Sequence, residues 1–207
     1  RNMRYSLCAF PLIGVVCGLA FWGWTALMYG AAAPDLLRGA GLCLIPVLVT
    51  GGIHLDGYAD TSDALASYAP PEKKREILQD PRCGAFAVIR LCTWFVAYFA
   101  LCTCVRWDSR ALLCMGLAFV LERCLSGFAI ATFPMAKNTG LAHTFAAAAD
   151  KTKVRWILAV VSVLLAAAMV FVGRFQGGAM VLAAAWILWR YYRVSKKQFG
   201  GITGDLA

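Results

Sequence analysis

Apolar residues run along the chain in long blocks separated by polar stretches. We interpret six blocks as helices long enough, or nearly so, to cross a bilayer: 8–31, 37–53, 85–105, 111–133, 154–173 and 178–194. A spanning helix needs ~20 mostly apolar residues, and the second block is shorter and ends in Gly51 and Gly52. The pattern predicts an all-α, polytopic membrane bundle that forms a single domain over residues 1–207.

The segments between the blocks are of two kinds. Residues 34–35, 106–110 and 174–178 are short turns, whereas 54–84 and 134–153 are long and polar, and we expect these two to be loops. With six spans, both long connections lie on the same side of the membrane as the N-terminal and C-terminal residues. The three short turns lie on the other side.

Basic residues are divided unequally between these two sides. Of the 20 Lys and Arg residues, 14 fall on the side of the long connections and four on the side of the short turns. The positive-inside rule then places the long connections in the cytoplasm. We expect a multi-pass protein of the bacterial or archaeal cytoplasmic (inner) membrane. This orientation and the anionic headgroups account for the net charge of +9, so a nucleic-acid partner is not needed.

Composition supports the membrane class and narrows the chemistry. Hydrophobic residues make up 61% and charged residues 15% of the chain, whereas soluble domains have roughly 45–50% and about 25%. The nine cysteines lie mostly inside apolar blocks and include no CxxC pair. Neither a zinc site nor a disulfide framework is therefore supported.

Three aspartates gather in the stretch "HLDGYADTSDAL" at residues 54–65. Asp56, Asp60 and Asp63 are spaced by four and three residues, which would place them on one face of a helix, where like charges repel unless a cation neutralises them. Carboxylates without Cys or paired His suit a hard cation, and Mg²⁺ is usual beside phosphates. We expect all three to bind Mg²⁺ and to act in catalysis. Solvation alone, or helix capping by Asp60 or Thr61, is the plainer interpretation, but capping explains only one aspartate.

Neighbouring residues could complete such a site. His54 is a candidate ligand, base or hydrogen-bond partner, and Gly57 would let a ligand approach the backbone beside Asp56. Thr61 lies between the aspartates and is a candidate substrate contact. Arg82, in "DPRCG", would suit a clamp for a diphosphate. The cations of "PPEKKRE", on a short amphipathic helix, could bind phosphate or lie near lipid headgroups, and we expect Lys73 and Lys74 at the surface.

Charged residues also interrupt the apolar blocks. Arg and Asp cost roughly +2.5–3.5 kcal/mol at the centre of a spanning helix, so they should pair or face a water-filled cavity. Glu122 and Arg90 form a plausible ion pair between helices, and Arg123 either shares that role or reaches a substrate phosphate. The tail "FGGITGD" at 199–205 could fold closely around a phosphate. Its candidate substrate contacts are Gly201, Thr203 and Asp205.

These segments, in this order, resemble the cobalamin-5′-phosphate synthase family, also called adenosylcobinamide-GDP ribazoletransferase. The resemblance is carried by "FPLIG" (10–14), "GGIHLDGYADTSDA" (51–64), "REILQDPRCGAFAVI" (75–89), "ATFPMAKNTGLAHTF" (131–145) and "FGGITGD" (199–205). Two departures are Ala64 after the third aspartate, where the family has Gly, and "PMAKNTGLA" in place of a "PYARPEGLG"-like form. The family's segment before "FPLIG" is not found here and the family continues beyond Asp205, so we expect contributing segments outside this sequence.

The resemblance implies a Mg²⁺-dependent transferase at the final stage of cobalamin (vitamin B12) biosynthesis. Such an enzyme joins adenosylcobinamide-GDP to α-ribazole or α-ribazole 5′-phosphate and releases GMP. The site would face the cytoplasm, beside the lipid bilayer, and homo-oligomerisation stays open. Which group takes the hydroxyl proton is also open, with one aspartate or His54 as the hypothesis.

Three other classes are compatible with parts of the sequence. "DGYAD" resembles part of the UbiA-type prenyltransferase pattern, but the connection 134–153 offers only Asp150 for a second acidic motif. CDP-alcohol phosphotransferases place Ala where Thr61 stands. A cation-coupled transporter would more often carry its charges at mid-membrane and show inverted repeats. All three rank below the first interpretation.

Overall fold

The computed structural model describes residues 4–136, 141–204 and 206, and this part of the chain is helical without a named strand. The helices are η1 Ser6–Ala9, α1 Phe10–Gly30, α2 Asp35–Thr50, α3 Ile53–Ala66, α4 Pro71–Ile77, α5 Ala85–Cys104, α6 Ser109–Thr132, α7 Leu141–Ala148, α8 Lys151–Val194 and η2 Ser195–Phe199. The expected all-α membrane bundle is therefore confirmed.

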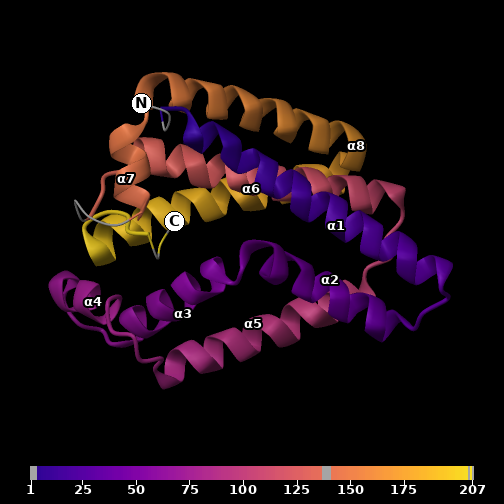
Figure 1. Cartoon of the computed structure of the whole chain (residues 1–207), viewed down its shortest axis with the longest axis horizontal. Coiled ribbons are helices and arrows are strands. Elements are labelled where there is room, and N and C mark those ends of the chain that lie inside the picture. The colour runs from indigo at the N-terminus through magenta and orange to yellow at the C-terminus, as the bar shows by residue number, and fades with distance from the viewer. Residues whose placement is uncertain (1–3, 137–140, 205, 207) are drawn as a thin grey trace.

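Each of the six expected spans coincides largely with a helix, but the span 37–53 runs past the end of α2 and the spans are arranged differently. In the described part of the chain, four helices are long and apolar enough to cross a membrane, or five if α2 and α3 together count as one span. Two expected spans lie within α8, on either side of Arg174, whose φ of 48° and ψ of −121° are not helical. The chain turns back there, so that the two parts of α8 run in opposite directions (Figure 1).

The expectation of a polar loop at 54–84 is wrong, because most of this segment is helical. α2 ends at Thr50, and Gly51 and Gly52 then take φ values of 64° and 78°. Glycine adopts this left-handed conformation readily, and α3 begins after a bend of 91°. The buried residues of α3, Gly57, Ala59, Ser62 and Ala64, are all small, so they give little apolar signal among its polar residues in the sequence. The second expected loop also contains a helix, α7.

The helices form two groups. In Figure 1, α2, α3, α4 and α5 form the lower group and α1, α6, α7 and α8 form the upper one. α2 and α3 both pack on α5, while α6 packs on α1 and α8. Small residues let α1 and α6 approach closely, since a Cβ on Gly14 would lie 2.5 Å from the carbonyl oxygen of Phe119. The groups meet where α1 contacts α2 and where α4 contacts η2.

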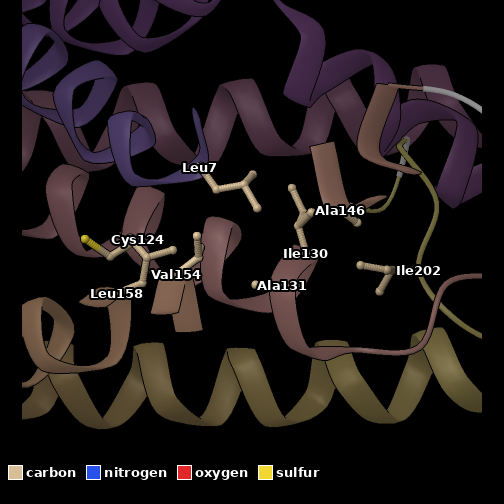
Figure 2. Close-up of a cluster of buried hydrophobic side chains, with 8 residues drawn as sticks. All are labelled: Leu7, Cys124, Ile130, Ala131, Ala146, Val154, Leu158 and Ile202. Carbon is tan, nitrogen blue, oxygen red and sulfur yellow. The ribbon is translucent and has the colours of Figure 1, made fainter. Parts of the chain in front are cut away.

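The largest buried cluster joins segments that are far apart in the sequence (Figure 2). It contains Leu7, Cys124, Ile130, Ala131, Ala146, Val154, Leu158 and Ile202. These residues come from η1, α6, α7, α8 and the C-terminal tail. The cluster holds the tail at the end of the bundle that also carries α4, α7 and the N-terminal residues (Figure 1). The long connections therefore share one end, as the sequence predicted.

Candidate functional site

α3 carries the acidic residues from the α2–α3 bend, where His54 lies against α6, towards the end of the bundle that has the long connections. His54 and Asp56 lie in its first turn, where the partial positive charge of the helix favours a carboxylate. Asp60 follows one turn later and Asp63 nearly one turn after that, so the expected shared face is present. Asp56 is exposed, whereas Asp60 and Asp63 are half-buried.

Asp63 has a structural task that the sequence did not reveal. Its Oδ2 accepts a hydrogen bond from the backbone N–H of Gly84 at 2.7 Å, and its Oδ1 accepts one from Ala87 at 2.9 Å. The carboxylate thereby satisfies two amides at the start of α5 that have no partner within that helix. A Cβ on Gly84 would lie 2.6 Å from Oδ2, so glycine allows this approach. Asp63 fixes the start of α5 against α3.

The three aspartates do not form a ready-made metal cage. Among the residues that the structure describes, no three His, Cys, Asp or Glu side chains come together as a group that could hold a metal ion. Mg²⁺, however, is usually bound by one or two carboxylates together with water and substrate phosphates. Asp56 and Asp60, one turn apart on α3, fit such an open site. A role for Asp63 as a ligand stays a prediction.

His54 contacts the guanidinium of Arg123, which reaches it from α6. The side chain of Arg123 is 12% exposed, and its Nε lies 2.5 Å from a carboxylate oxygen of Glu122. The expected pair of Glu122 with Arg90 is therefore wrong. Arg90 is exposed on α5, and the adjacent Arg123 supplies the counter-charge instead. Arg123 lies between an imidazole and a carboxylate.

A cavity of about 220 Å³ surrounds this contact. Residues of α1, α2, α3, α5 and α6 line it, and they include Thr50, His54, Glu122 and Arg123. The cavity lies at the bend between α2 and α3, which directs His54 towards α6. The sequence could not have predicted this site, because His54 and Arg123 are 69 residues apart.

Arg82 lies in the connection between α4 and α5, close in sequence to Gly84. Its Nε and Nη2 donate hydrogen bonds to the two carboxylate oxygens of Asp80, at 2.9 and 2.8 Å. These hydrogen bonds from Arg82 hold the pKa of Asp80 at about 2, so the pair is charged at neutral pH. The Arg82 side chain is still 86% exposed, which leaves guanidinium surface open to an anion.

The remaining candidates on α3 and in the tail lie in packed surroundings. Gly57 is buried, and the hydroxyl of the half-buried Thr61 lacks a hydrogen-bond partner among the described residues. Gly201 has a φ of 152°, and a Cβ there would lie 2.5 Å from the carbonyl oxygen of Pro134. Thr203 is 4% exposed. Their contacts with substrate stay predictions, and Asp205 lies outside the described residues.

The tail pairs with the segment that follows α6. The N–H of Ile202 donates to the carbonyl of Pro134 at 2.8 Å, and the N–H of Ala136 donates to the carbonyl of Ile202 at 2.8 Å. Gly201 is required for this close approach, because its conformation and its space both exclude a side chain. Gly201 thus has a structural reason to be present, apart from any contact with phosphate.

α4 binds the end of α8 through two basic residues. Lys74 is only 5% exposed and donates to the side-chain oxygen of Gln198. The expectation that Lys74 lies at the surface is therefore wrong. Arg75 donates to the backbone carbonyl of Phe199 at 2.9 Å. Both partners belong to η2, a π-helix, which is a rare conformation often found near functional sites.

Comparison with known proteins agrees with these motifs. A family model described as cobalamin-5-phosphate synthase matches residues 1–207. A protein of Lachnoclostridium phytofermentans, named adenosylcobinamide-GDP ribazoletransferase, is 40% identical over 206 residues, which cover 100% of this chain and 78% of that protein. Relatives of the same name from Pseudomonas putida and Pseudomonas savastanoi pv. phaseolicola are 35% and 32% identical, over 100% of this chain and 82% and 83% of their own lengths. No solved structure matches the chain. The chain belongs to the cobalamin-5-phosphate synthase family.

Proposed function

We propose that this protein is a membrane transferase that joins adenosylcobinamide-GDP to α-ribazole, or to α-ribazole 5′-phosphate, and releases GMP. The reaction belongs to the final stage of cobalamin biosynthesis. The observation that carries the proposal is the match over the whole chain to relatives that bear this enzyme's name. That match also favours this activity over the UbiA-type, CDP-alcohol-type and transporter alternatives.

The site lies on the cytoplasmic side of a bacterial or archaeal cytoplasmic membrane. Two observations support this placement. Most Lys and Arg residues fall on the side of the long connections, which favours the cytoplasm. The end of α3, α4, α7 and the C-terminal tail share one end of the bundle (Figure 1). A site there would be open to water-soluble, charged substrates.

Asp56 and Asp60 would hold Mg²⁺ in this reaction. When bound, the ion would neutralise the diphosphate that links cobinamide to guanosine. The two carboxylates are one turn apart on α3, and Asp63 orders the neighbouring start of α5. Phosphoryl transfer depends mainly on the position of the reacting groups and on neutralisation of their charge. Carboxylates held on one face of a helix can position the metal ion for this purpose.

Cationic and titratable side chains near the acidic face of α3 would bind the substrates and accept a proton from them. Arg82 offers an exposed guanidinium to the diphosphate, while Asp80 holds its orientation. Arg123 could bind a phosphate oxygen from the cavity at the α2–α3 bend. One aspartate, or His54, would accept the proton from the attacking ribazole hydroxyl. These assignments rest on placement and charge.

Release of GMP by the purified protein in detergent or nanodiscs tests the activity. We expect GMP to form only when adenosylcobinamide-GDP, α-ribazole or its 5′-phosphate, and Mg²⁺ are all present. Chelation with EDTA should stop the reaction and added Mg²⁺ should restore it. A protein that is folded and loaded with both substrates, yet releases no GMP under these conditions, would overturn the proposal.

A further inference from the structure

A second cavity, of about 450 Å³, lies between α6 and α8. Its walls are mainly aliphatic, with Leu121 and Leu125 from α6 and Met180, Ala184 and Leu188 from the part of α8 after Arg174. Leu206 of the tail also lines it. The volume falls within the range of small-molecule sites, near its lower end, and the lining is typical of a site for an apolar ring system.

This cavity and the smaller one at the α2–α3 bend share Glu122. The side chain of Glu122 is 54% exposed although it lies near the middle of α6, in a segment apolar enough to cross the membrane. Arg123, its partner at 2.5 Å, lines the smaller cavity together with His54. A molecule in the larger cavity could therefore extend one polar end to Glu122 and towards the His54–Arg123 contact.

Polar groups in the larger cavity also point to a ligand that is not purely aliphatic. Ser126 lies one turn after Glu122 on the same face of α6, and both line the cavity. Tyr191 lines it from α8, and its hydroxyl oxygen is buried with no hydrogen-bond partner in the described part of the chain. Buried polar atoms are normally satisfied, so an orphaned hydroxyl here favours an occupant that can hydrogen-bond.

We propose that this cavity binds the aromatic base of the ribazole substrate, with the ribose directed towards Glu122. The inference rests on the proposed function and assigns one substrate to one cavity. Guanosine diphosphate is highly charged and does not suit aliphatic walls, and a corrin macrocycle is too large for this volume. The ribazole base is a flat, largely apolar bicycle whose one unsubstituted ring nitrogen can accept a hydrogen bond. The cavity thus acts as the acceptor subsite, and its width sets which bases fit.

Narrowing the cavity from either wall tests this assignment. Ala184→Leu and Ala118→Leu add bulk at lining positions on α8 and α6. Ala185→Leu adds the same bulk at an exposed neighbour that does not line the cavity, and serves as the matched control. We expect the KM and Kd for α-ribazole to rise about tenfold or more in the two lining variants, with the KM for adenosylcobinamide-GDP unchanged. The control should behave as wild type.

A second measurement does not require the protein to fold with a larger side chain in the cavity. Ser126→Cys places a thiol in the cavity, and mass spectrometry can follow its alkylation by a small maleimide. We expect α-ribazole to slow this alkylation several-fold, and adenosylcobinamide-GDP to leave it unchanged. The inference would be overturned if α-ribazole did not slow alkylation of the thiol. It would also be overturned if the folded lining variants bound α-ribazole as tightly as wild type. Both results are expected if a lipid chain fills the cavity. GMP release by the wild-type protein is measured separately. A wild-type protein that releases GMP while these two tests fail would therefore contradict the assignment of the cavity and leave the proposed activity intact.

Discussion

At the scale of single residues, the acidic positions of α3 separate into two kinds. Asp56 and Asp60 lie on the face that we assign to Mg²⁺, whereas Asp63 uses both carboxylate oxygens on backbone amides of Gly84 and Ala87. The sequence predicted the spacing and the shared face correctly, because both follow from helical geometry. It could not predict the capping role, because the partners lie 21 and 24 residues away.

Replacing Asp63 with Asn should lower stability more than the same change at Asp56. One oxygen becomes an NH₂ group, so one of two partly buried backbone amides loses its acceptor, at a cost of about 1 kcal/mol or more. Asp56 is exposed, and Asp56→Asn should leave the melting temperature nearly unchanged. Thermal unfolding of both variants in the same detergent measures the difference. Equal melting temperatures for Asp63→Asn and wild type would show that the cap is not stabilising.

At the scale of elements, the bend between α2 and α3 builds the site. It places His54 against Arg123 and opens the smaller cavity between five helices. The sequence predicted the end of the second span at Gly51 and Gly52, yet it suggested a loop beyond them. Polar side chains on α3 resembled a solvated segment, and its small buried residues gave too weak an apolar signal to identify a helix. The contact between α3 and α6 depends on tertiary packing.

Gly52→Ala should therefore disturb both stability and the site. The φ of Gly52 is 78°, a conformation that costs a residue with a Cβ roughly 1–2 kcal/mol. Gly23→Ala is the matched control, since a Cβ there meets no neighbouring atom within 4 Å. We expect a lower melting temperature and reduced GMP release for Gly52→Ala alone. If both variants match wild type in both measurements, the bend does not depend on glycine.

At the scale of the whole molecule, two groups of helices are joined by the packing of α1 on α2 and by the contact between α4 and η2. Between these two connections, His54 of α3 also contacts Arg123 of α6. The sequence predicted a single bundle and the helix at α4, and it placed the long connections on one side. It did not predict that Lys74 and Arg75 would bind η2, because basic residues beside a membrane helix ordinarily face the headgroups.

Arg75→Ala should weaken the connection between the two groups. Its hydrogen bond to the carbonyl of Phe199 would be lost, and hydrogen bonds from charged groups contribute about 1.5–3 kcal/mol. Lys73→Ala is the matched control, because Lys73 is exposed and pairs only with Glu76 among the described residues. We expect limited proteolysis to cut the α4–α5 connection of Arg75→Ala faster than that of the control. Identical cleavage rates would contradict a joining role.

The central claim is that the carboxylates of Asp56 and Asp60 on α3 form the reaction site, and turnover of Asp60→Asn tests it most directly. GMP release with both substrates and saturating Mg²⁺ should fall by about 100-fold or more, while the variant keeps the gel-filtration profile of wild type. Asp108→Asn is the control, since Asp108 is an exposed carboxylate that caps α6, and Asn can serve as that cap. It should turn over normally. Near-normal GMP release by a folded Asp60→Asn protein would contradict the claim.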